Sequence, residues 1–274
     1  MSASPTPPRL SARSLDAGYP GRRVIENLDL EVEPGRITMI IGANACGKST
    51  LLGVLARLHA PLGGEVLLDD VDVASIPRRR FAQRVGLLPQ HPVAPDGLTV
   101  GELVARGRHP HRGVFERWSA ADTAQVDDAL RLTGVEALAD RPVGDLSGGQ
   151  RQRVWIAMAL AQNPEILLLD EPTTFLDLSH QLEVLDLLVE LNRVQGTTIV
   201  VVLHELNLAA RYADDLVVMR EGRIVAQGSP RDVLTAEVVS DAFALDALVM
   251  PDPLTGTPLV VPRPGGAHLT PDPT

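Results

Sequence analysis

Short apolar runs alternate with amphipathic segments along most of the chain. The runs are rich in Val, Ile and Leu and end in polar or turn residues; they cover Thr38–Ile41, Val85–Leu88, Ile166–Asp170 and Thr198–Leu203. Such runs are typical of parallel strands that are buried on both faces. Helical periodicity is found over Ser49–Arg57, Ser179–Gln195 and Leu206–Tyr212. The alternation predicts an α/β fold with a doubly wound sheet.

Other segments depart from this alternation. Strand patterns flank the turn Gly18-Tyr19-Pro20-Gly21, a strand is expected after the turn at Pro61, and a hairpin is expected around Glu221-Gly222; these strands cover Leu10–Asp16, Val24–Glu33, Glu65–Leu68, Leu216–Arg220 and Arg223–Ala226. Between about residues 98 and 159 the pattern is helical, with candidates at Val100–Arg106, Ala120–Thr133, Val135–Ala139 and Gly149–Ala161. The sequence therefore predicts a helical insertion in the α/β core.

The two ends of the chain differ from its middle. Residues 1–9 are rich in Ser, Pro and Thr, carry no apolar stretch of a signal peptide and are expected to be disordered. Residues 10–235 read as one domain without internal repeats. Residues 236–274 are expected to be an extension with one short helix and a Pro/Gly-rich tail.

Composition narrows the function. The net charge of −10 at pH 7 gives no overall basic field, which argues against nucleic acid as the main ligand. One cysteine excludes a disulfide within the chain and fits a reducing compartment. The longest apolar runs are far shorter than the roughly 20 residues of a spanning helix. A role at the membrane would therefore require a partner.

The segment Gly42-Ala43-Asn44-Ala45-Cys46-Gly47-Lys48-Ser49-Thr50 matches the phosphate-loop pattern G-x-x-x-x-G-K-[ST], between a predicted strand and a predicted helix. Its backbone N–H groups and the helix N-terminus suit phosphate oxygens. Lys48 is expected to neutralise β- and γ-phosphate charge, and Ser49 to coordinate Mg²⁺. The segment predicts an ATP site.

A second feature is the strand Ile166–Asp170, which ends in Asp170 and is followed by Glu171. Two carboxylates at the end of a buried strand are costly unless they bind a cation or position water. Asp170 is expected to hold Mg²⁺ and Glu171 to polarise the attacking water. The simpler alternative is an acidic cap on the next helix.

The most specific pattern is Leu146-Ser147-Gly148-Gly149-Gln150, which Arg151-Gln152-Arg153 follows. Ser147 alone would be an ordinary helix cap. The full string resembles the signature of the ATP-binding-cassette (ABC) ATPases, and the resemblance covers about residues 10–260. It implies a RecA-like P-loop NTPase core with an N-terminal antiparallel β subdomain and an inserted α-helical signature subdomain.

The resemblance implies roles for further residues. In the family the signature contacts ATP on a second copy of the domain, so it implies a head-to-tail dimer. Gln90 matches the glutamine that reaches Mg²⁺ and the attacking water, and His204 matches the switch histidine at the γ-phosphate. Asp177 matches an acid that connects the two sites. Tyr19 resembles the aromatic residue that stacks on adenine, and a plain turn tyrosine is the alternative.

Some residues of the loop depart from the family. Ala43 and Ala45 stand where Pro and Gly are usual, and the Cβ of Ala45 restricts the backbone. The change is expected to alter nucleotide affinity at most. Cys46 lies near Lys48 and a helix N-terminus, which can lower a thiol pKa. It is interpreted as a passive small residue, with a redox role as the alternative.

Three segments resemble the ATPases of ferric-siderophore importers: Gly107–His111, Asp170–Gln181 and Leu206–Asp214, together with Asp252–Pro258 near the end. The resemblance implies permease subunits and, indirectly, a substrate-binding lipoprotein as partners, at the cytoplasmic face of the membrane. Vitamin B12 or haem import and a non-transport ABC ATPase are the alternatives. His109 and His111 lack the further ligands of a metal site and are expected to face a membrane partner.

Overall fold

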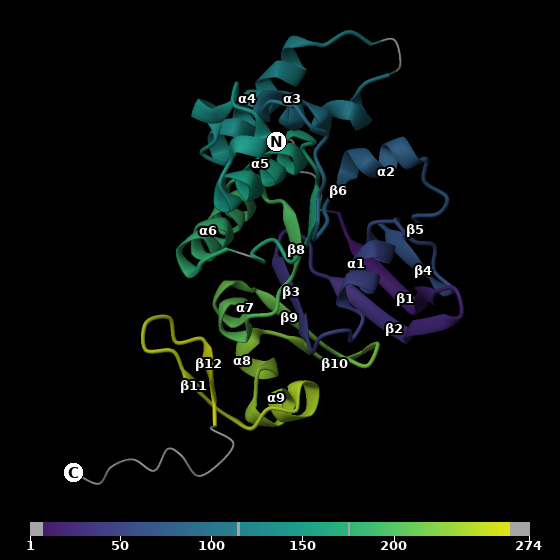
Figure 1. Cartoon of the computed structure of the whole chain (residues 1–274). Helices are drawn as coiled ribbons and strands as arrows, with labels where there is room; N and C mark the ends of the chain where they lie inside the picture. The colour runs from purple at the N-terminus through teal and green to yellow at the C-terminus, as the bar shows by residue number, and fades with distance from the viewer. Residues whose placement is uncertain (1–7, 114–115, 175, 264–274) are drawn as a thin grey trace, which may run out of the picture.

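The computed structural model describes residues 8–113, 116–174 and 176–263 (Figure 1). Residues 1–7 of the segment expected to be disordered, and the tail from residue 264, lie outside the described residues. Arg9 of that segment is in contact with the fold, because its N–H donates to Asp69 Oδ1 at 2.9 Å.

A six-stranded sheet forms the centre of the molecule, in the order β10-β9-β3-β8-β7-β6. Its strands are β3 (Ile37–Gly42), β6 (Val85–Leu88), β7 (Ile166–Asp170), β8 (Thr198–Val202), β9 (Asp215–Arg220) and β10 (Arg223–Gly228). All neighbours are parallel except β9 and β10. The predicted doubly wound sheet and its terminal hairpin are confirmed. The carboxyl ends of β3, β6, β7 and β8 meet at one edge, where the polar residues that follow them come together.

A smaller antiparallel sheet covers one face of the central sheet, in the order β2-β1-β4-β5. Its strands are β1 (Leu10–Tyr19), β2 (Arg22–Val32), β4 (Gly63–Leu68) and β5 (Val71–Asp72). The strand β1 extends beyond the predicted Leu10–Asp16, as far as Tyr19, which pairs with Arg22 across the turn. Helix α1 (Lys48–Leu55) packs between the two sheets, and together they enclose one of the two apolar cores.

The helical insertion comprises α3 (Val100–Ala105), η1 (Arg106–His111), α4 (Ala120–Leu132), η2 (Glu136–Leu138), η3 (Val143–Asp145) and α5 (Gly148–Ala161). Capping boxes start the three α-helices, at Thr99, Ser119 and Ser147. The prediction of a helix over Val135–Ala139 was wrong, because the structure forms only the 3₁₀ turn η2 there. The residues between α4 and α5 make short turns instead.

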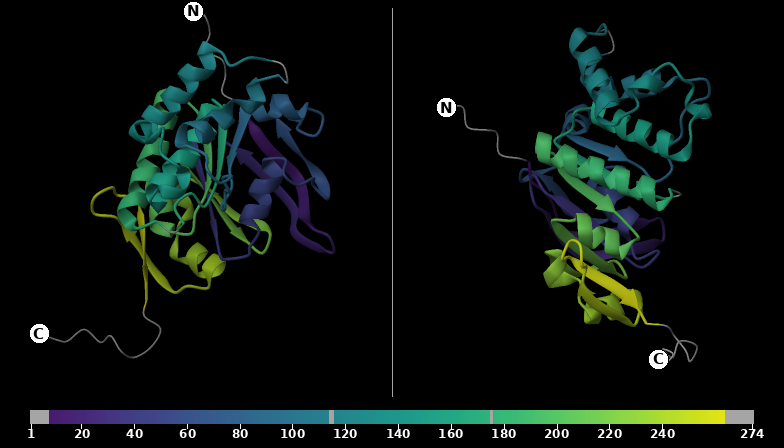
Figure 2. Two further views of the ribbon diagram at one scale, coloured as in Figure 1. Left: turned by 45° about the horizontal axis from the view of Figure 1, so that its top comes forward. Right: turned by 90° about the vertical axis from the view of Figure 1, so that its left-hand side faces the viewer.

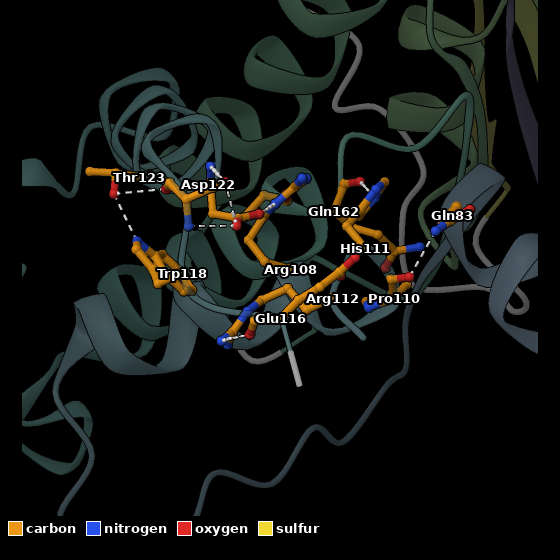
Figure 3. A network of polar contacts seen from close by, with 12 residues as sticks. Gln83, Arg108, Pro110, His111, Arg112, Glu116, Trp118, Asp122, Thr123 and Gln162 are labelled. Carbon is orange, nitrogen blue, oxygen red and sulfur yellow. Dashed lines mark hydrogen bonds and ion pairs between the residues drawn. The ribbon is translucent and has the colours of Figure 1, made fainter. Parts of the chain in front are cut away.

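A buried ion pair holds the insertion together (Figure 3). Arg108 is 7% exposed and Asp122 is 6% exposed. Arg108 Nε donates to Asp122 Oδ1 at 3.0 Å, and its Nη1 donates to the carbonyl of Ala161 at the end of α5 at 2.8 Å. The side chain of His111 lies against the carbonyl of Gln162, with Nε2 2.7 Å from the oxygen. The turn η1, which contains His109 and His111, is therefore joined to α4 and to the end of α5.

Helix α2 (Arg78–Arg84) packs its Phe81 into the core on the side of the smaller sheet. The remaining elements cover the second face and the far end of the central sheet. They are α6 (Leu178–Gln195), α7 (Leu206–Tyr212), α8 (Pro230–Val233), α9 (Ala236–Phe243), β11 (Ala247–Pro251) and β12 (Pro258–Pro262). Figures 1 and 2 show the insertion and the β11–β12 hairpin at opposite ends of the molecule. No helix within the described ranges combines the length and apolar character that crossing a bilayer requires.

The C-terminal region corrects one prediction. The expectation of a short helix and a tail after residue 236 missed the hairpin, although α9 is present. Pro251, Pro258 and Pro262 hid the strands from the pattern, because Pro is depleted in strands. Tertiary contacts to α7 hold the hairpin. The division of the chain at residue 235 stays a prediction.

Candidate functional site

The phosphate loop connects β3 to α1 at the carboxyl edge of the sheet. Gly47 precedes α1 without a side-chain cap, so no N-cap side chain competes with an anion for the first N–H groups of the helix. A Cβ on Gly42 would lie 2.3 Å from the carbonyl oxygen of Met219, so only glycine fits there. Lys48 is buried, and its Nζ donates to the carbonyls of Gly42 at 2.8 Å and Ala43 at 3.1 Å. The loop thus wraps around its own lysine.

The sequence left alternatives open for two residues of the phosphate loop, Ala45 and Cys46. Ala45 has a φ of 61°, the left-handed region in which an L-residue with a Cβ costs about 1–2 kcal/mol. Cys46 is 6% exposed and packs in the core beneath the loop. Burial raises the pKa of its thiol, against the opposing effect of Lys48. A raised thiol pKa disfavours the reactive thiolate, which supports the interpretation of Cys46 as a packing residue.

The two carboxylates after β7 lie opposite the loop. Ser49 Oγ donates to Asp170 Oδ1 at 3.1 Å. Burial raises the pKa of Asp170, and the hydrogen bond from Ser49 opposes this shift. A hydroxyl and a carboxylate so close together are hard oxygen donors of the kind that Mg²⁺ takes. The residues fit the metal that the sequence predicted at this place.

Glu171 is the centre of a polar cluster. It is 9% exposed and has a φ of 51°, a strained conformation of the kind found at functional sites. Gln90 Nε2 donates to Glu171 Oε2, and His204 Nε2 contacts Oε1. Thr174 Oγ1 also donates to Oε2, at 3.1 Å. The structure therefore brings the three predicted residues Gln90, Glu171 and His204 into direct contact.

A cleft of about 410 Å³ runs along these groups. Its lining is Tyr19, Arg22, Val24, Asn44, Ala45, Gly47, Lys48, Ser49, Thr50, Gln90, Glu171 and His204. Tyr19 is 48% exposed and its hydroxyl lies 3.5 Å from Thr50 Oγ1, so an aromatic face is available at the mouth. Gly42, Ala43, Cys46 and Asp170 support the cleft without lining it.

Sequence reasoning missed three residues here. Arg22 and Val24 line the cleft because β2 returns beside Tyr19, a pairing that the predicted turn could have indicated. Thr174 reaches Glu171 through a tight turn, in which its N–H donates to the carbonyl of Glu171 at 3.2 Å. A hydroxyl three residues after the acid was the only signal.

The signature residues lie away from this cleft. Leu146 to Gln150 span the start of α5, and the side chain of Ser147 accepts from the N–H of Gln150 at 3.3 Å. Asp177 caps α6. It accepts from the N–H of His180 at 3.0 Å, contacts the His180 ring Nδ1 at 2.6 Å and accepts from Ser179 Oγ at 2.8 Å, and these contacts lower its pKa to about 2. A Cβ on Gly149 would lie 2.5 Å from the ring of His180, so the two motifs touch. None of them contributes to the chain's own cleft.

A phosphate loop at the edge of a parallel sheet, faced by two carboxylates at the end of a strand two positions away in the sheet, defines a P-loop nucleoside triphosphatase. Within that class the helical insertion and its signature are the distinguishing features. The chain belongs to the ABC transporter family, whose model matches residues 25–174.

Named proteins that are similar to this chain support its assignment to the family. The chain is 51% identical to the achromobactin transport ATP-binding protein CbrD of Dickeya dadantii, over 92% of this chain and 94% of that protein. It is 51% identical to the ferric enterobactin transport ATP-binding protein FepC of Escherichia coli, over 93% and 94%. A solved structure assigned to a metal-chelate type ABC transporter, in an inward-facing conformation, matches with a TM-score of 0.81 and 30% identity, over 93% and 98% of the two chains.

Proposed function

We propose that the protein is the ATP-hydrolysing subunit of an ABC importer that takes up ferric siderophores across the cytoplasmic membrane. The contact of Gln90 and His204 with Glu171, opposite Lys48, carries the ATPase part of the proposal. The cargo follows from the relatives, one of which is named for ferric enterobactin and another for achromobactin. Uptake of vitamin B12 or haem is the alternative cargo.

ATP binds along the cleft with its base at Tyr19 and its phosphates at the start of α1. The N–H groups at the start of α1 and the ammonium of Lys48 stabilise the phosphate charge. Ser49 and Asp170, with Gln90 nearby, would hold Mg²⁺, and the ion would supply positive charge to the phosphate oxygens. These residues hold the γ-phosphate where water can attack it in line.

Glu171 accepts the proton of the attacking water. Its carboxylate is buried and held from both sides, since Gln90 and Thr174 donate to one oxygen and His204 contacts the other. A carboxylate fixed in this way loses little orientational freedom when it binds water. His204 also lies in the cleft, where it reaches the γ-phosphate.

A second copy of the chain completes each site. The N-terminus of α5 presents Ser147 and Gly148 away from the chain's own cleft, with backbone N–H groups suited to a phosphate. The contact between Gly149 and His180 joins this helix to the turn of Asp177. A head-to-tail dimer therefore places two ATP molecules between two chains.

A surface groove of about 280 Å³ is the docking site for a permease subunit. It is lined by residues 92–98, Val143, Gly144, Arg151 and Trp155. The groove lies on the segment that follows Gln90, so an occupant would contact the cleft through that segment. The segment Gly107–His111, which was expected to face a membrane partner, does not line this groove. Through the permease, the subunit lies at the cytoplasmic face of the membrane and cooperates with a substrate-binding lipoprotein.

Deletion of the gene tests the cargo. Growth on individual iron–siderophore complexes should fail and return with the wild-type gene, but not with Lys48→Ala. Normal growth on every iron chelate, with loss of vitamin B12 or haem uptake, would favour the alternative cargo. Co-purification with a multi-span permease separates both from a non-transport ATPase.

Two valine substitutions test whether the permease docks in this groove. Val93 is 87% exposed, and Val194 on α6 is 61% exposed. We expect Val93→Arg to abolish transport while ATP hydrolysis by the isolated subunit is retained, and Val194→Arg to leave both unchanged. Normal transport by Val93→Arg contradicts docking in this groove.

A further inference from the structure

Two segments contact each other that the proposed ATP site does not use. They are Leu206–Asp214 and Asp252–Pro258. Helix α7, which lies in the segment Leu206–Asp214, begins two residues after His204. The segment Asp252–Pro258 forms the tip of the β11–β12 hairpin, and β12 packs along α7. Figures 1 and 2 show the hairpin beside α7 at the end opposite to the helical insertion.

Asn207 fastens α7 to the hairpin by two hydrogen bonds to one residue. Its Nδ2 donates to the carbonyl of Val260 at 3.2 Å, and its Oδ1 accepts from the N–H of Val260 at 2.7 Å. Val260 is 4% exposed and lies on β12, whose other neighbour is β11. Asn207 therefore acts as the missing strand for this edge, satisfying a donor and an acceptor that burial would otherwise leave unpaired.

Arg211 makes a second connection, one turn further along α7. Its Nη2 donates to Asp252 Oδ2 at 2.6 Å, and Asp252 is 6% exposed. The other oxygen of Asp252 accepts from the N–H of Leu254 at 2.8 Å and of Thr255 at 3.4 Å. One carboxylate thus shapes the hairpin tip and holds the guanidinium.

The far end of α7 is also held. The hydroxyl of Tyr212 donates to Asp186 on α6 at 2.8 Å. At the near end, the N–H of Leu203 donates to the carbonyl of Ile40 on β3, and His204 then meets Glu171. Only Glu205 separates His204 from the first residue of α7, so a displacement of α7 must move the His204 backbone.

We propose that Asn207 and Arg211 are positioning residues for His204, and that the β11–β12 hairpin is the brace that holds α7. The proposal rests on the proposed function, in which His204 contacts the γ-phosphate. The hairpin then sets the rate of hydrolysis without touching nucleotide.

The test replaces Asn207 by leucine, which keeps the size of the side chain and removes both hydrogen bonds. We expect kcat for ATP hydrolysis per folded subunit to fall about tenfold, since small misplacements of a reacting group are costly. The Kd for MgATP should not change, because the phosphate loop lies on other elements. Asn192 provides the matched control: its Nδ2 donates to the carbonyls of Gly35 and Thr197, at the opposite edge of the sheet. Asn192→Leu should lower thermal stability with kcat unchanged.

A double-mutant cycle with His204→Ala separates positioning from general damage. In the His204→Ala background, Asn207→Leu should produce no further loss of kcat. If Asn207→Leu does not fold, Asp252→Asn keeps the acceptor for the turn and removes the charge that holds Arg211; its kcat should fall about two- to threefold, again only when His204 is present.

Independent, multiplicative losses in the cycle overturn the proposal, as does an equal effect of Asn207→Leu and Asn192→Leu on kcat. The result also separates this inference from the proposed function. A large loss in His204→Ala with none in Asn207→Leu refutes only the brace. Full hydrolysis by both Glu171→Gln and His204→Ala refutes the proposed catalytic site itself.

Discussion

Replacement of Glu171 by glutamine removes one proton acceptor from the cleft and keeps the shape of the side chain. Oε2 of Glu171 accepts from Gln90 and Thr174, and Oε1 faces His204 Nε2. A glutamine amide has one acceptor end and one donor end. Its oxygen fits the Oε2 position and its nitrogen the Oε1 position, provided that His204 Nε2 accepts. The variant should therefore keep the geometry of the cleft.

In the proposed mechanism, only the proton transfer from water should then be lost. General base catalysis contributes about 10²–10⁴-fold, so the barrier to hydrolysis should rise by about 3–5 kcal/mol. Phosphate release at saturating MgATP measures this, and a fluorescent nucleotide should show an unchanged Kd. Because bound ATP then persists, the dimer should accumulate. Light scattering with MgATP should give about twice the 29.4 kDa of one chain.

Glu190 on α6 supplies the control, since it is exposed and far along the helix from the cleft. Glu190→Gln should hydrolyse ATP at the wild-type rate. Hydrolysis by Glu171→Gln above about a tenth of the wild-type rate would show that Glu171 is not the base. A strictly monomeric variant loaded with ATP, alone and with its permease, would contradict the shared sites.

Three further predictions concern stability and the loop. Asp122→Asn leaves buried Arg108 without its charge partner and should cost about 3–5 kcal/mol in urea unfolding. Hydrogen bonds from Ser119 and then Arg108 lower the pKa of Asp122 to about 2, so this difference should be constant from pH 8 to 5 and shrink as the pH falls below about 4; a constant difference at pH 3 would contradict it. Ala45→Gly should leave the Kd for ATP within about twofold, because the backbone strain belongs to the folded loop and not to binding, whereas a tenfold change would refute this. Burial raises the pKa of the Cys46 thiol, so mass spectrometry should find its alkylation at pH 8 slower than that of free cysteine; equal rates would show an accessible thiolate.

The central sheet and the phosphate loop were accessible from the sequence because their signals are local. The continuous apolar run of β7 predicts burial on both faces, and the loop pattern between β3 and α1 needs no distant residue. The hairpin at the C-terminus was not accessible in this way. Its strands begin or end at Pro251, Pro258 and Pro262, and its stability comes from Asn207 and Arg211, more than 40 positions away.

The site shows the same difference between residues that the sequence indicates and contacts that it does not. Lys48 and Glu171 could be named from motifs at strand ends, which parallel strands present at one edge. Gln90 and His204, also at strand ends, were named from the resemblance to the ABC family. The sequence could not indicate that Gln90 and His204 hold opposite oxygens of Glu171, or that Thr174 joins them. Which oxygen accepts from which donor depends on the local backbone, including the positive φ of Glu171.

The sequence by itself determined the class of fold, the nucleotide site and the residue types that carry the chemistry. These depend on hydrophobic periodicity and on motifs a few residues long, which neighbouring positions encode. Only the tertiary structure decided that α7 is braced by the C-terminal hairpin, that Arg108 pairs with Asp122, and that the signature lies outside the chain's own cleft. Such contacts join residues far apart in the chain, and their energy depends on burial and on the exact donor and acceptor, which the folded packing alone sets.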